Sequence, residues 1–550
     1  MSYKLLKNGK ILTPDGFCTA LLIKDKTIVF TGSDEETMAV ARSEAGTESL
    51  VLQTDLSGKL VMPGLIDSHA HGGGFGAMAL GKLELSECET KEECVSAIKN
   101  YAKKNPDLSF LKGYGWSSPL FGELGPDKMI LDDICPDIPC AIQSAEGHAW
   151  WVNSKMLQNA GVNQETPNPR GGKIFRDIAG NPSGCLADEA AELIQPFVPD
   201  DPVEVYKNAI LLYQEEMLPL GITSTGELLV RKNSNLHKAY RELAEKNDLK
   251  IKTVLHFTVK PSTVLEDIKE LHHREYRENN KLIEGSFVKF FLDGVLENHT
   301  CALKEDYAND PGFKGELLWD THVLKKAMAD IDSFGYNIHV HCIGDAAVSQ
   351  ALDAFAYLLD LNGEREDRKL VLAHVQLLDA TDLARMETMN VMVSANPYWF
   401  FKDPIYTKEN ELPELGEERM ERQYPMRSLF DRGIIVSSGS DYPITLCPYP
   451  VLAVKCGMQR VGYDCPGTDE ESLLGPSERC TLDQMIRSIT INGAMTLGID
   501  NGPDGGTGVL SPGKLADIIV LDQDIFAISA DDYNAVKVEK VYSEGELLFS

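Results

Sequence analysis

The sequence lacks the segments that mark exported and membrane proteins. Its first ten residues hold no apolar core of signal-peptide length. No uninterrupted apolar run reaches the roughly 18 residues that a membrane-spanning helix needs. Basic residues are scarce beside acidic ones, 53 against 84, and the resulting net charge of −31 disfavours a nucleic-acid or anionic-membrane partner. These absences predict a soluble cytoplasmic protein.

The 12 cysteines include no CxxC pair and no dense framework. Scattered cysteines of this kind predict reduced thiols rather than disulfides or a thiolate metal site. Internal repeats and low-complexity tracts are also absent. A chain of 550 residues with 43% hydrophobic content is too long for one simple core, so two or three structural units are expected.

Short apolar runs rich in β-branched residues alternate with helix-like stretches along most of the chain. This alternation is typical of βα units and a parallel sheet. Strands are predicted at Val61–Asp67, Ile222–Leu228, Ile251–Val259, Phe287–Asp293, Asn337–Cys342, Leu370–Val375, Val391–Pro397 and Ile434–Asp441. Helices are predicted among them at Val203–Met217, Val323–Phe334, Ala346–Leu361 and Ala380–Met389. Eight units predict an α/β fold, a (β/α)8 TIM barrel with its active site at the C-terminal ends of the strands.

Candidate metal ligands gather at those predicted strand ends. Strand one gives His69 and His71, strand four Lys289, strand five His339 and His341, strand six His374 and strand eight Asp441. Two histidines spaced two apart on an extended segment share one side of it. Neutral imidazole is the commonest metal ligand in proteins. The combined pattern therefore predicts a metal centre at the mouth of the barrel.

Several longer motifs resemble those of the amidohydrolase superfamily, and in particular its YtcJ-like branch, which includes N-substituted formamide deformylases. The resemblance rests on the segments 63–71 (PGLIDSHAH), 147–154 (GHAWWVNS), 341–345 (HCIGD), 438–443 (SGSDYP) and 513–518 (GKLADI). Two departures concern the pocket. Ala373 stands where the branch often carries a glutamate, and the loop Leu296–Thr300 differs from the branch's usual pattern.

The resemblance implies a binuclear centre. His69 and His71 would hold one ion and His341 and His374 the other, with Lys289, carboxylated by carbon dioxide to a carbamate, as the bridge. Two ions within about 4 Å can share a hydroxide and polarise a carbonyl together. Imidazole ligands favour zinc, with iron and manganese as alternatives. For Lys289 the alternative is a strand-end lysine that reaches solvent.

Asp441 is expected to contact the first metal and to carry a proton from the attacking water to the leaving amine. A helix N-cap is the alternative role for this residue. His339 is interpreted as a core or supporting histidine and His256 as structural. Asp345 either orients a ligand or caps a helix. The sequence does not decide between an exposed and a pocket-lining place for His299.

Segments outside the barrel strands suggest two further units. Residues 1–60 and 500–550 read as short strands, and neither end has enough apolar residues for a core of its own. The resemblance implies that they pack together in a small β-sandwich, with two independent decorations as the alternative; residues 61–499 would form the barrel. The long segment 82–202 lies between strands one and two and is expected to wall the pocket. Within it, Trp116 and Trp151 are predicted to bind substrate or else to pack the insertion. His148 is predicted to donate to the substrate carbonyl oxygen or else to stabilise the insertion.

These features favour a metal-dependent amidohydrolase that cleaves a linear C–N bond, in an amide or an N-substituted formamide, through a metal-bridging hydroxide. Hydrolysis of a cyclic amide and deamination of an aromatic ring are the alternatives on the same fold, and a non-catalytic scaffold is a remote one. The expected partner is a small-molecule substrate. The acyl and amine parts of that substrate, and the choice between a monomer and a homodimer, are left open.

Overall fold

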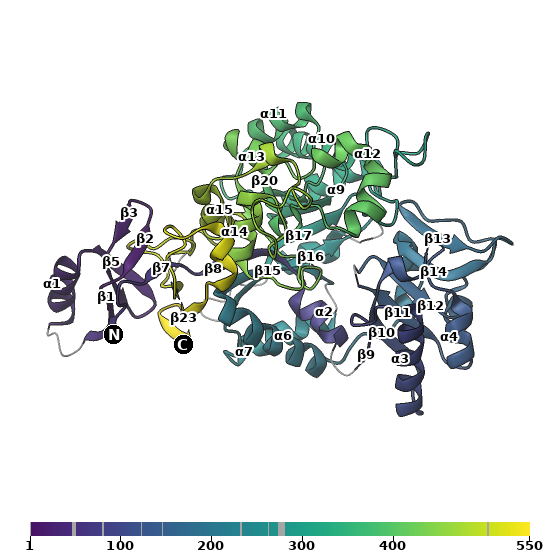
Figure 1. The fold of residues 1–550 in the computed structure, drawn as a ribbon, viewed down its shortest axis with the longest axis horizontal. Coiled ribbons are helices and arrows are strands. Elements are labelled where there is room, and N and C mark those ends of the chain that lie inside the picture. Colours follow the sequence, from purple (N-terminus) through teal and green to yellow (C-terminus); the bar gives the residue numbers. More distant parts are fainter. Residues whose placement is uncertain are drawn as a thin grey trace.

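The computed structural model describes residues 2–46, 51–79, 82–122, 124–145, 147–231, 234–261, 263, 265–272, 281–502 and 505–550. Figure 1 shows three parts in a row: sheets that contain both ends of the chain on the left, a barrel in the middle, and an inserted sheet on the right. No helix in the described ranges has both the length and the apolar character needed to cross a bilayer.

Both ends of the chain contribute to the sheets beside the barrel. One sheet has the order β5-β4-β1-β6 and the other β24-β23-β22-β7-β2-β3. Their strands are β1 Tyr3–Lys7, β2 Lys10–Thr13, β3 Gly16–Cys18, β4 Ala20–Lys24, β5 Thr27–Gly32, β6 Val51–Asp55, β7 Leu60–Pro63, β22 Ile518–Leu521, β23 Val538–Ser543 and β24 Glu546–Phe549. Helix α1 (Asp34–Ala45) begins at a capping box formed by Ser33 and Glu36. Leu6, Val61 and Ile518 lie in one shared core, so neither terminal segment buries its apolar side alone.

Eight parallel strands form the barrel and confirm the predicted TIM fold. Their order is β8-β15-β16-β17-β18-β19-β20-β21. They span β8 Leu65–Ala70, β15 Ile222–Val230, β16 Lys252–Val259, β17 Leu282–Phe291, β18 Asn337–Cys342, β19 Leu370–His374, β20 Met392–Ala395 and β21 Val436–Ser438. The last strand meets the first where the Asp441 amide donates to the His69 carbonyl at 2.7 Å and the His71 amide donates to that of Tyr442 at 2.9 Å.

The first barrel strand begins later than predicted. The apolar run that looked like one strand is divided between β7, which pairs with β22 in the terminal sheet, and β8 of the barrel. The chain passes from one sheet to the other at Gly64, where an added Cβ would lie 2.2 Å from Thr223 Oγ1. Proline followed by a tightly packed glycine breaks the strand, although the run is apolar throughout.

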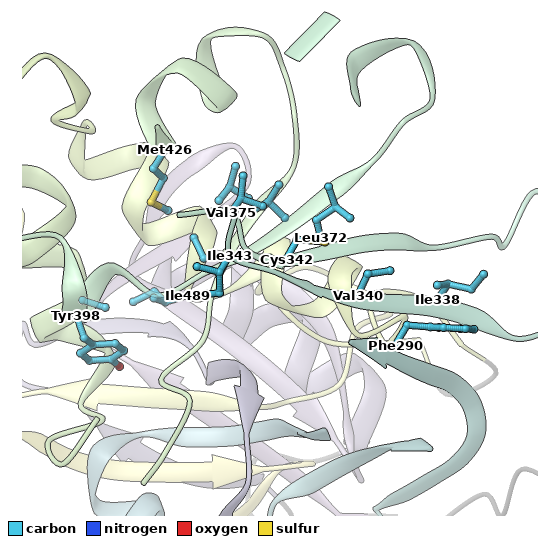
Figure 2. Close-up of a cluster of buried hydrophobic side chains, with 14 of the residues drawn as sticks. Phe290, Ile338, Val340, Cys342, Ile343, Leu372, Val375, Tyr398, Met426 and Ile489 are labelled. Carbon is cyan, nitrogen blue, oxygen red and sulfur yellow. The ribbon is translucent and has the colours of Figure 1, made fainter. Parts of the chain in front are cut away.

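Helices surround the barrel and cover the outward faces of its strands. They are α6 Val203–Met217, α7 Asn235–Glu245, α8 Leu265–His272, α9 Thr321–Ser333, α10 Asp345–Asn362, α11 Ala380–Thr388, α12 Leu412–Glu421, α13 Met426–Asp431, α14 Pro450–Gln459, α15 Leu482–Ser488 and α16 Ile491–Thr496. Along β18, Ile338, Val340 and Cys342 belong to the large apolar core (Figure 2). Because side chains alternate along a strand, the residues between them, His339 and His341, face the barrel interior.

The insertion between β8 and β15 contains a six-stranded sheet of its own, with the order β13-β14-β12-β11-β10-β9. Its strands are β9 Leu83–Glu84, β10 Leu111–Trp116, β11 Cys140–Ser144, β12 Ala149–Val152, β13 Gly172–Arg176 and β14 Pro182–Asp188. Helices α3 Lys91–Lys104, α4 Lys128–Ile134 and α5 Ser154–Ala160 accompany this sheet, and α2 Gly72–Ala79 follows β8 directly. The sheet stands beside the barrel in Figure 1. The turn between β11 and β12, which contains His148, can therefore reach the barrel mouth.

Candidate metal centre

Three candidate ligands from the first and last strands converge at the barrel mouth. His71 Nε2 lies 2.9 Å and His69 Nε2 3.5 Å from Asp441 Oδ1. One possible ligand atom from each of the three residues lies within 4.8 Å of those of the other two. All three residues are buried. The structure therefore brings together two motifs that are separated by more than half the chain.

The backbones of these two motifs are held together by a glycine and an aspartate. A Cβ on Gly439 would lie 2.4 Å from the Cβ of His69, so only glycine permits this approach. The Asp67 carboxylate accepts from the Ser440 amide at 2.9 Å and from the Ser440 hydroxyl at 2.5 Å. Burial raises the pKa of Asp67 to about 6. The contact between Asp67 and Ser440 thus gives a structural role to two residues that lie next to the candidate ligands in the sequence.

A second pair of histidines lies next to the first. The ring centroids of His341 and His374 are 4.7 Å apart, and that of His374 is 4.9 Å from His69. His374 Nδ1 is 2.8 Å from Asn396 Oδ1, and His341 Nε2 is 3.3 Å from the Gly294 carbonyl. Each contact uses one ring nitrogen, so the other nitrogen would be available to a metal ion, as is usual for histidine ligands.

Burial keeps these histidines in the neutral form that binds metals. It lowers the pKa of His374 to about 4. It also lowers the pKa values of His69 and His341 well below the ordinary range, with further lowering from neighbouring positive groups. Burial disfavours the charged form of an imidazole, so a buried ring loses its proton at a lower pH than an exposed one. The centre therefore offers uncharged nitrogens to a cation at neutral pH.

Lys289 lies on β17 inside the barrel and does not reach solvent. Its side chain is fully buried. Within the described residues, its Nζ has no hydrogen-bond partner. Burial lowers the pKa of the amine to about 7. A buried amine with no partner is costly unless something compensates it, and loss of its proton leaves a nucleophile.

The backbone is strained where two of the strands deliver their ligands. His374 and Asp441 have φ angles of +69° and +57°, and Val375, next to His374, has +48°. Such conformations cost about 1–3 kcal/mol for non-glycine residues and persist where the surroundings enforce them, often at functional sites. The strained positions coincide with the predicted ligands.

The insertion delivers His148 to this centre. Its ring centroid is 5.9 Å from that of His341, and its Nδ1 is 2.8 Å from Asp188 Oδ1. The side chain keeps 27% of its surface exposed. Of the three residues predicted to face the substrate from the insertion, His148 is the one that the structure places beside the metal ligands.

Trp116 and Trp151 lie elsewhere, and this corrects the prediction that they bind substrate. Both are fully buried in the insertion's own core. There the centroid of the Phe121 ring is 5.8 Å from that of Trp116 and 5.1 Å from that of Trp151. Their indole N–H groups donate to the carbonyls of Ile142 and Asp127. With both polar ends satisfied inside the insertion, these rings pack that unit.

The remaining histidines occupy different environments. His339 points into the barrel, 5.4 Å from the His69 ring, and neither of its ring nitrogens has a hydrogen-bond partner among the described residues. His256 packs against Phe287 at 4.5 Å, and its Nδ1 is 3.2 Å from the Val254 carbonyl. Both are buried in the layer below the ligands.

His299 and Asp345 bind loops rather than the metal centre. His299 lies between Glu414 and Asp310, at 2.5 and 3.2 Å. Asp345 accepts the amide of Lys304 at 2.8 Å and is the first residue of α10, where its negative charge suits the N-terminal end of the helix. Both contacts involve the long connection after β17.

Three supporting residues were missed by reasoning from the sequence: Asp293, Asn396 and Asp188. The Asp293 carboxylate accepts three backbone amides, from Ala302, Ile343 and Gly344, and burial raises its pKa to about 7. The only signal for Asp293 was its place at the end of a predicted strand. Asn396 and Asp188 carried no distinguishing pattern, because their partners lie far away in sequence.

The residues at this site fit a divalent metal centre. Four imidazoles and an ionised carboxylate are suitable ligands for zinc and similar ions. Burial alone would raise the pKa of Asp441, but hydrogen bonding and charge from His71, with help from other neighbours, lower it to about 2. The buried Lys289 amine lies among these candidate ligands and has no hydrogen-bond acceptor in the part of the chain that the structure describes. Divalent cations, together with a modified Lys289, would supply partners for the ring nitrogens and for the lysine side chain.

Comparisons with known proteins cover nearly the whole chain. Residues 54–549 match the amidohydrolase family. The putative amidohydrolase YtcJ of Bacillus subtilis is 28% identical, over 96% of this chain and 96% of that protein. The N-substituted formamide deformylase of Arthrobacter pascens is 26% identical, over 99% and 98%. A solved structure of an uncharacterized metal-dependent hydrolase from Pyrococcus furiosus superposes with a TM-score of 0.70 at 25% identity, over 95% of this chain and 99% of that one.

Proposed function

The chain belongs to the amidohydrolase family and is a metal-dependent hydrolase; within that class we propose that it cleaves a linear C–N bond in an N-substituted amide or formamide. The observation that carries the proposal is the buried Lys289 amine, which has no hydrogen-bond partner among the described residues and lies among four histidines and Asp441. This set supplies ligands for two ions and a bridge between them. The similarity to a formamide deformylase supports the choice of a linear amide.

His69, His71 and Asp441 would hold one metal ion, and His341 and His374 the other. When bound, two ions would polarise the substrate carbonyl and lower the pKa of water. Zinc suits these ligands best, and iron and manganese are the alternatives. We assign the bridging position to Lys289 as a carbamate.

The environment of Lys289 supports carbamate formation. Because its pKa is lowered to about 7, a substantial fraction of the amine is neutral near neutral pH. The neutral nitrogen attacks the carbon of carbon dioxide, a C–N bond forms and one proton leaves to solvent. The product is an anion with two oxygens, which converts a group that repels cations into one that binds them.

Asp441 is the group proposed to move protons. With a pKa of about 2 it is ionised at neutral pH, so it can accept a proton from the attacking water. It then returns that proton to the nitrogen of the leaving amine as the C–N bond breaks. General acid–base catalysis of this kind needs a carboxylate within reach of both atoms, and Asp441 stands at the mouth of the barrel.

His148 is proposed to stabilise negative charge on the carbonyl oxygen. We expect His148→Ala to lower kcat by roughly a hundredfold, the effect of losing about 3 kcal/mol from one such donor. Metal content should change little, because His148 is outside the proposed ligand set. The melting temperature should fall only slightly, because the His148 side chain is partly exposed and Asp188, which loses this partner, keeps the Thr300 hydroxyl. Steady-state kinetics, thermal melting and metal analysis together check this.

His322→Ala is the matched control, since His322 is an exposed residue on α9. If His148→Ala melts at a lower temperature and its folded fraction turns over normally, His148 stabilises the insertion and takes no part in the reaction.

A substrate screen tests the proposed reaction. Metal-loaded protein is offered N-substituted formamides, other linear N-acyl amines, cyclic amides and ring-amino heterocycles, and amine, acid or ammonia release is measured. Turnover confined to linear amides supports the proposal. Ammonia release from a ring, or opening of a cyclic amide without linear turnover, would assign the site to the other reactions of the same fold.

We also propose that the protein works in a reducing compartment such as the cytoplasm, on a small molecule and without nucleic acid. All 12 cysteines are free thiols, and the net charge of −31 disfavours polyanionic partners.

A further inference from the structure

We propose that Asp188 and Thr300 position His148, so that the insertion completes the catalytic site through one carboxylate; the inference rests on the function proposed for His148. Asp188 ends strand β14 of the insertion, and Thr300 lies in the loop after barrel strand β17. Neither residue belongs to the predicted ligand set.

Asp188 contacts His148 in two ways. Its Oδ1 is 2.8 Å from His148 Nδ1, and its backbone amide donates to the His148 carbonyl at 2.7 Å. Its side chain is only 4% exposed, so the interaction with the histidine is shielded from solvent. Side chain and backbone of Asp188 together fix both the ring and the main chain of His148.

The second carboxylate oxygen of Asp188 connects the insertion to the barrel. Asp188 Oδ2 accepts the Thr300 hydroxyl at 2.5 Å, and the Val295 amide donates to the same Thr300 oxygen at 3.1 Å. A Cβ on Gly294 would lie 2.1 Å from Thr300 Oγ1 and 3.0 Å from Asp188 Cγ. The contact therefore requires glycine at position 294, whose carbonyl also lies 3.3 Å from His341 Nε2.

The contact determines which nitrogen of His148 carries a proton. Asp188 Oδ2 already accepts the Thr300 hydroxyl, and we assign Oδ1 the same accepting role, so that Nδ1 of His148 donates to it. The substrate is then met by Nε2, and the ring cannot rotate without breaking this bond. A carboxylate that orients a histidine in this way has a large effect on catalysis in other enzymes without touching the substrate.

The backbone of Asp188 supports a functional reading of this contact. Its φ and ψ angles are +48° and −124°, a conformation that costs a non-glycine residue about 1–3 kcal/mol. The strain is tolerated where side chain and amide both reach His148.

The alternative is that Asp188 and Thr300 only dock the insertion. A double-mutant cycle separates the two accounts, because a residue that acts through His148 has nothing left to act on once His148 is alanine. The variants are Asp188→Asn, Thr300→Val and Thr300→Ser, each made in the wild type and in His148→Ala. Kinetics on a linear amide, melting temperature and metal content are measured for all of them.

We expect Asp188→Asn to lower kcat on the order of a hundredfold and Thr300→Val about tenfold, the loss of one hydrogen bond to a charged group, with KM changed little. Thr300→Ser, which keeps the hydroxyl, should recover most of that loss. In the His148→Ala background neither Asp188→Asn nor Thr300→Val should reduce kcat further. A further reduction of similar size in that background, or equal losses in Thr300→Ser and Thr300→Val, would overturn the proposal.

A readout that needs no substrate keeps the inference separate from the proposed function. Nitrogen NMR of histidine-labelled protein, with His148→Ala to assign the signal, reports which ring nitrogen carries the proton. Wild type should show His148 protonated at Nδ1, and Asp188→Asn should weaken or reverse this preference. An unchanged signal contradicts the positioning role, whereas a correct signal without amide turnover contradicts only the proposed reaction. Should Asp188→Asn fail to fold, Thr300→Val gives the same decision.

Discussion

Asp441→Asn is expected to lose kcat on the order of a thousandfold, within the range that a positioned acid–base group contributes, while it keeps most of its metal. The substitution preserves shape and one oxygen ligand. It removes the charge that accepts a proton from water, and the amide cannot pass that proton to the leaving amine. Because His69 and His71 remain, the ion that they are proposed to hold should stay in place.

Metal analysis, thermal melting and kinetics on the same preparation check this expectation. Asp330→Asn is the matched control, since Asp330 makes a surface ion pair with Lys326 on α9. Normal turnover by Asp441→Asn would show that another group moves the proton. Loss of metal in parallel with activity would show instead that Asp441 acts only as a ligand.

Lys289→Met should lose at least one metal equivalent and nearly all activity, because methionine cannot form a carbamate bridge. The melting temperature of the metal-free protein should not fall. A buried amine without a partner costs stability, and methionine fills a similar volume with an apolar side chain. Retained metal with normal turnover in Lys289→Met would remove the bridge from the account.

Lys289→Ala provides a complementary control. It leaves a cavity beside the ligands that a short-chain carboxylate such as propionate could occupy. Partial recovery of metal binding on adding propionate, with none in Lys289→Met where the space is filled, is the expected contrast. Recovery in neither variant would mean that an anion at this position does not hold the ions.

Much of the barrel could be predicted because its sequence pattern is local. Helix α6 spans Val203–Met217 and strand β18 Asn337–Cys342, as predicted. The first strand was misplaced because Leu60–Ile66 is apolar throughout, and only packing shows that the chain changes sheets at Gly64. Apolar character identifies a buried strand but not the sheet to which it belongs.

The candidate ligands could be predicted for a similar reason: each one lies within three residues of the C-terminal end of a strand, and parallel strands end on the same side. The residues that orient them could not. Asp188 and Thr300 are 112 residues apart and meet across two separate units, and Asn396 reaches His374 from a neighbouring strand end. The substrate-binding role predicted for Trp116 and Trp151 was wrong because aromatic rings in a segment near a pocket can also pack the core of that segment.

The central claim is that each chain holds two metal ions bridged by a modified Lys289. Metal analysis of wild-type protein, purified without chelator and supplied with isotopically labelled bicarbonate, tests it most directly. The account predicts close to two metal equivalents and a labelled carbamate carbon in the NMR spectrum that Lys289→Met lacks. A value close to one equivalent, with no labelled carbon at Lys289, would contradict it and would favour a single-metal site of the deaminase type.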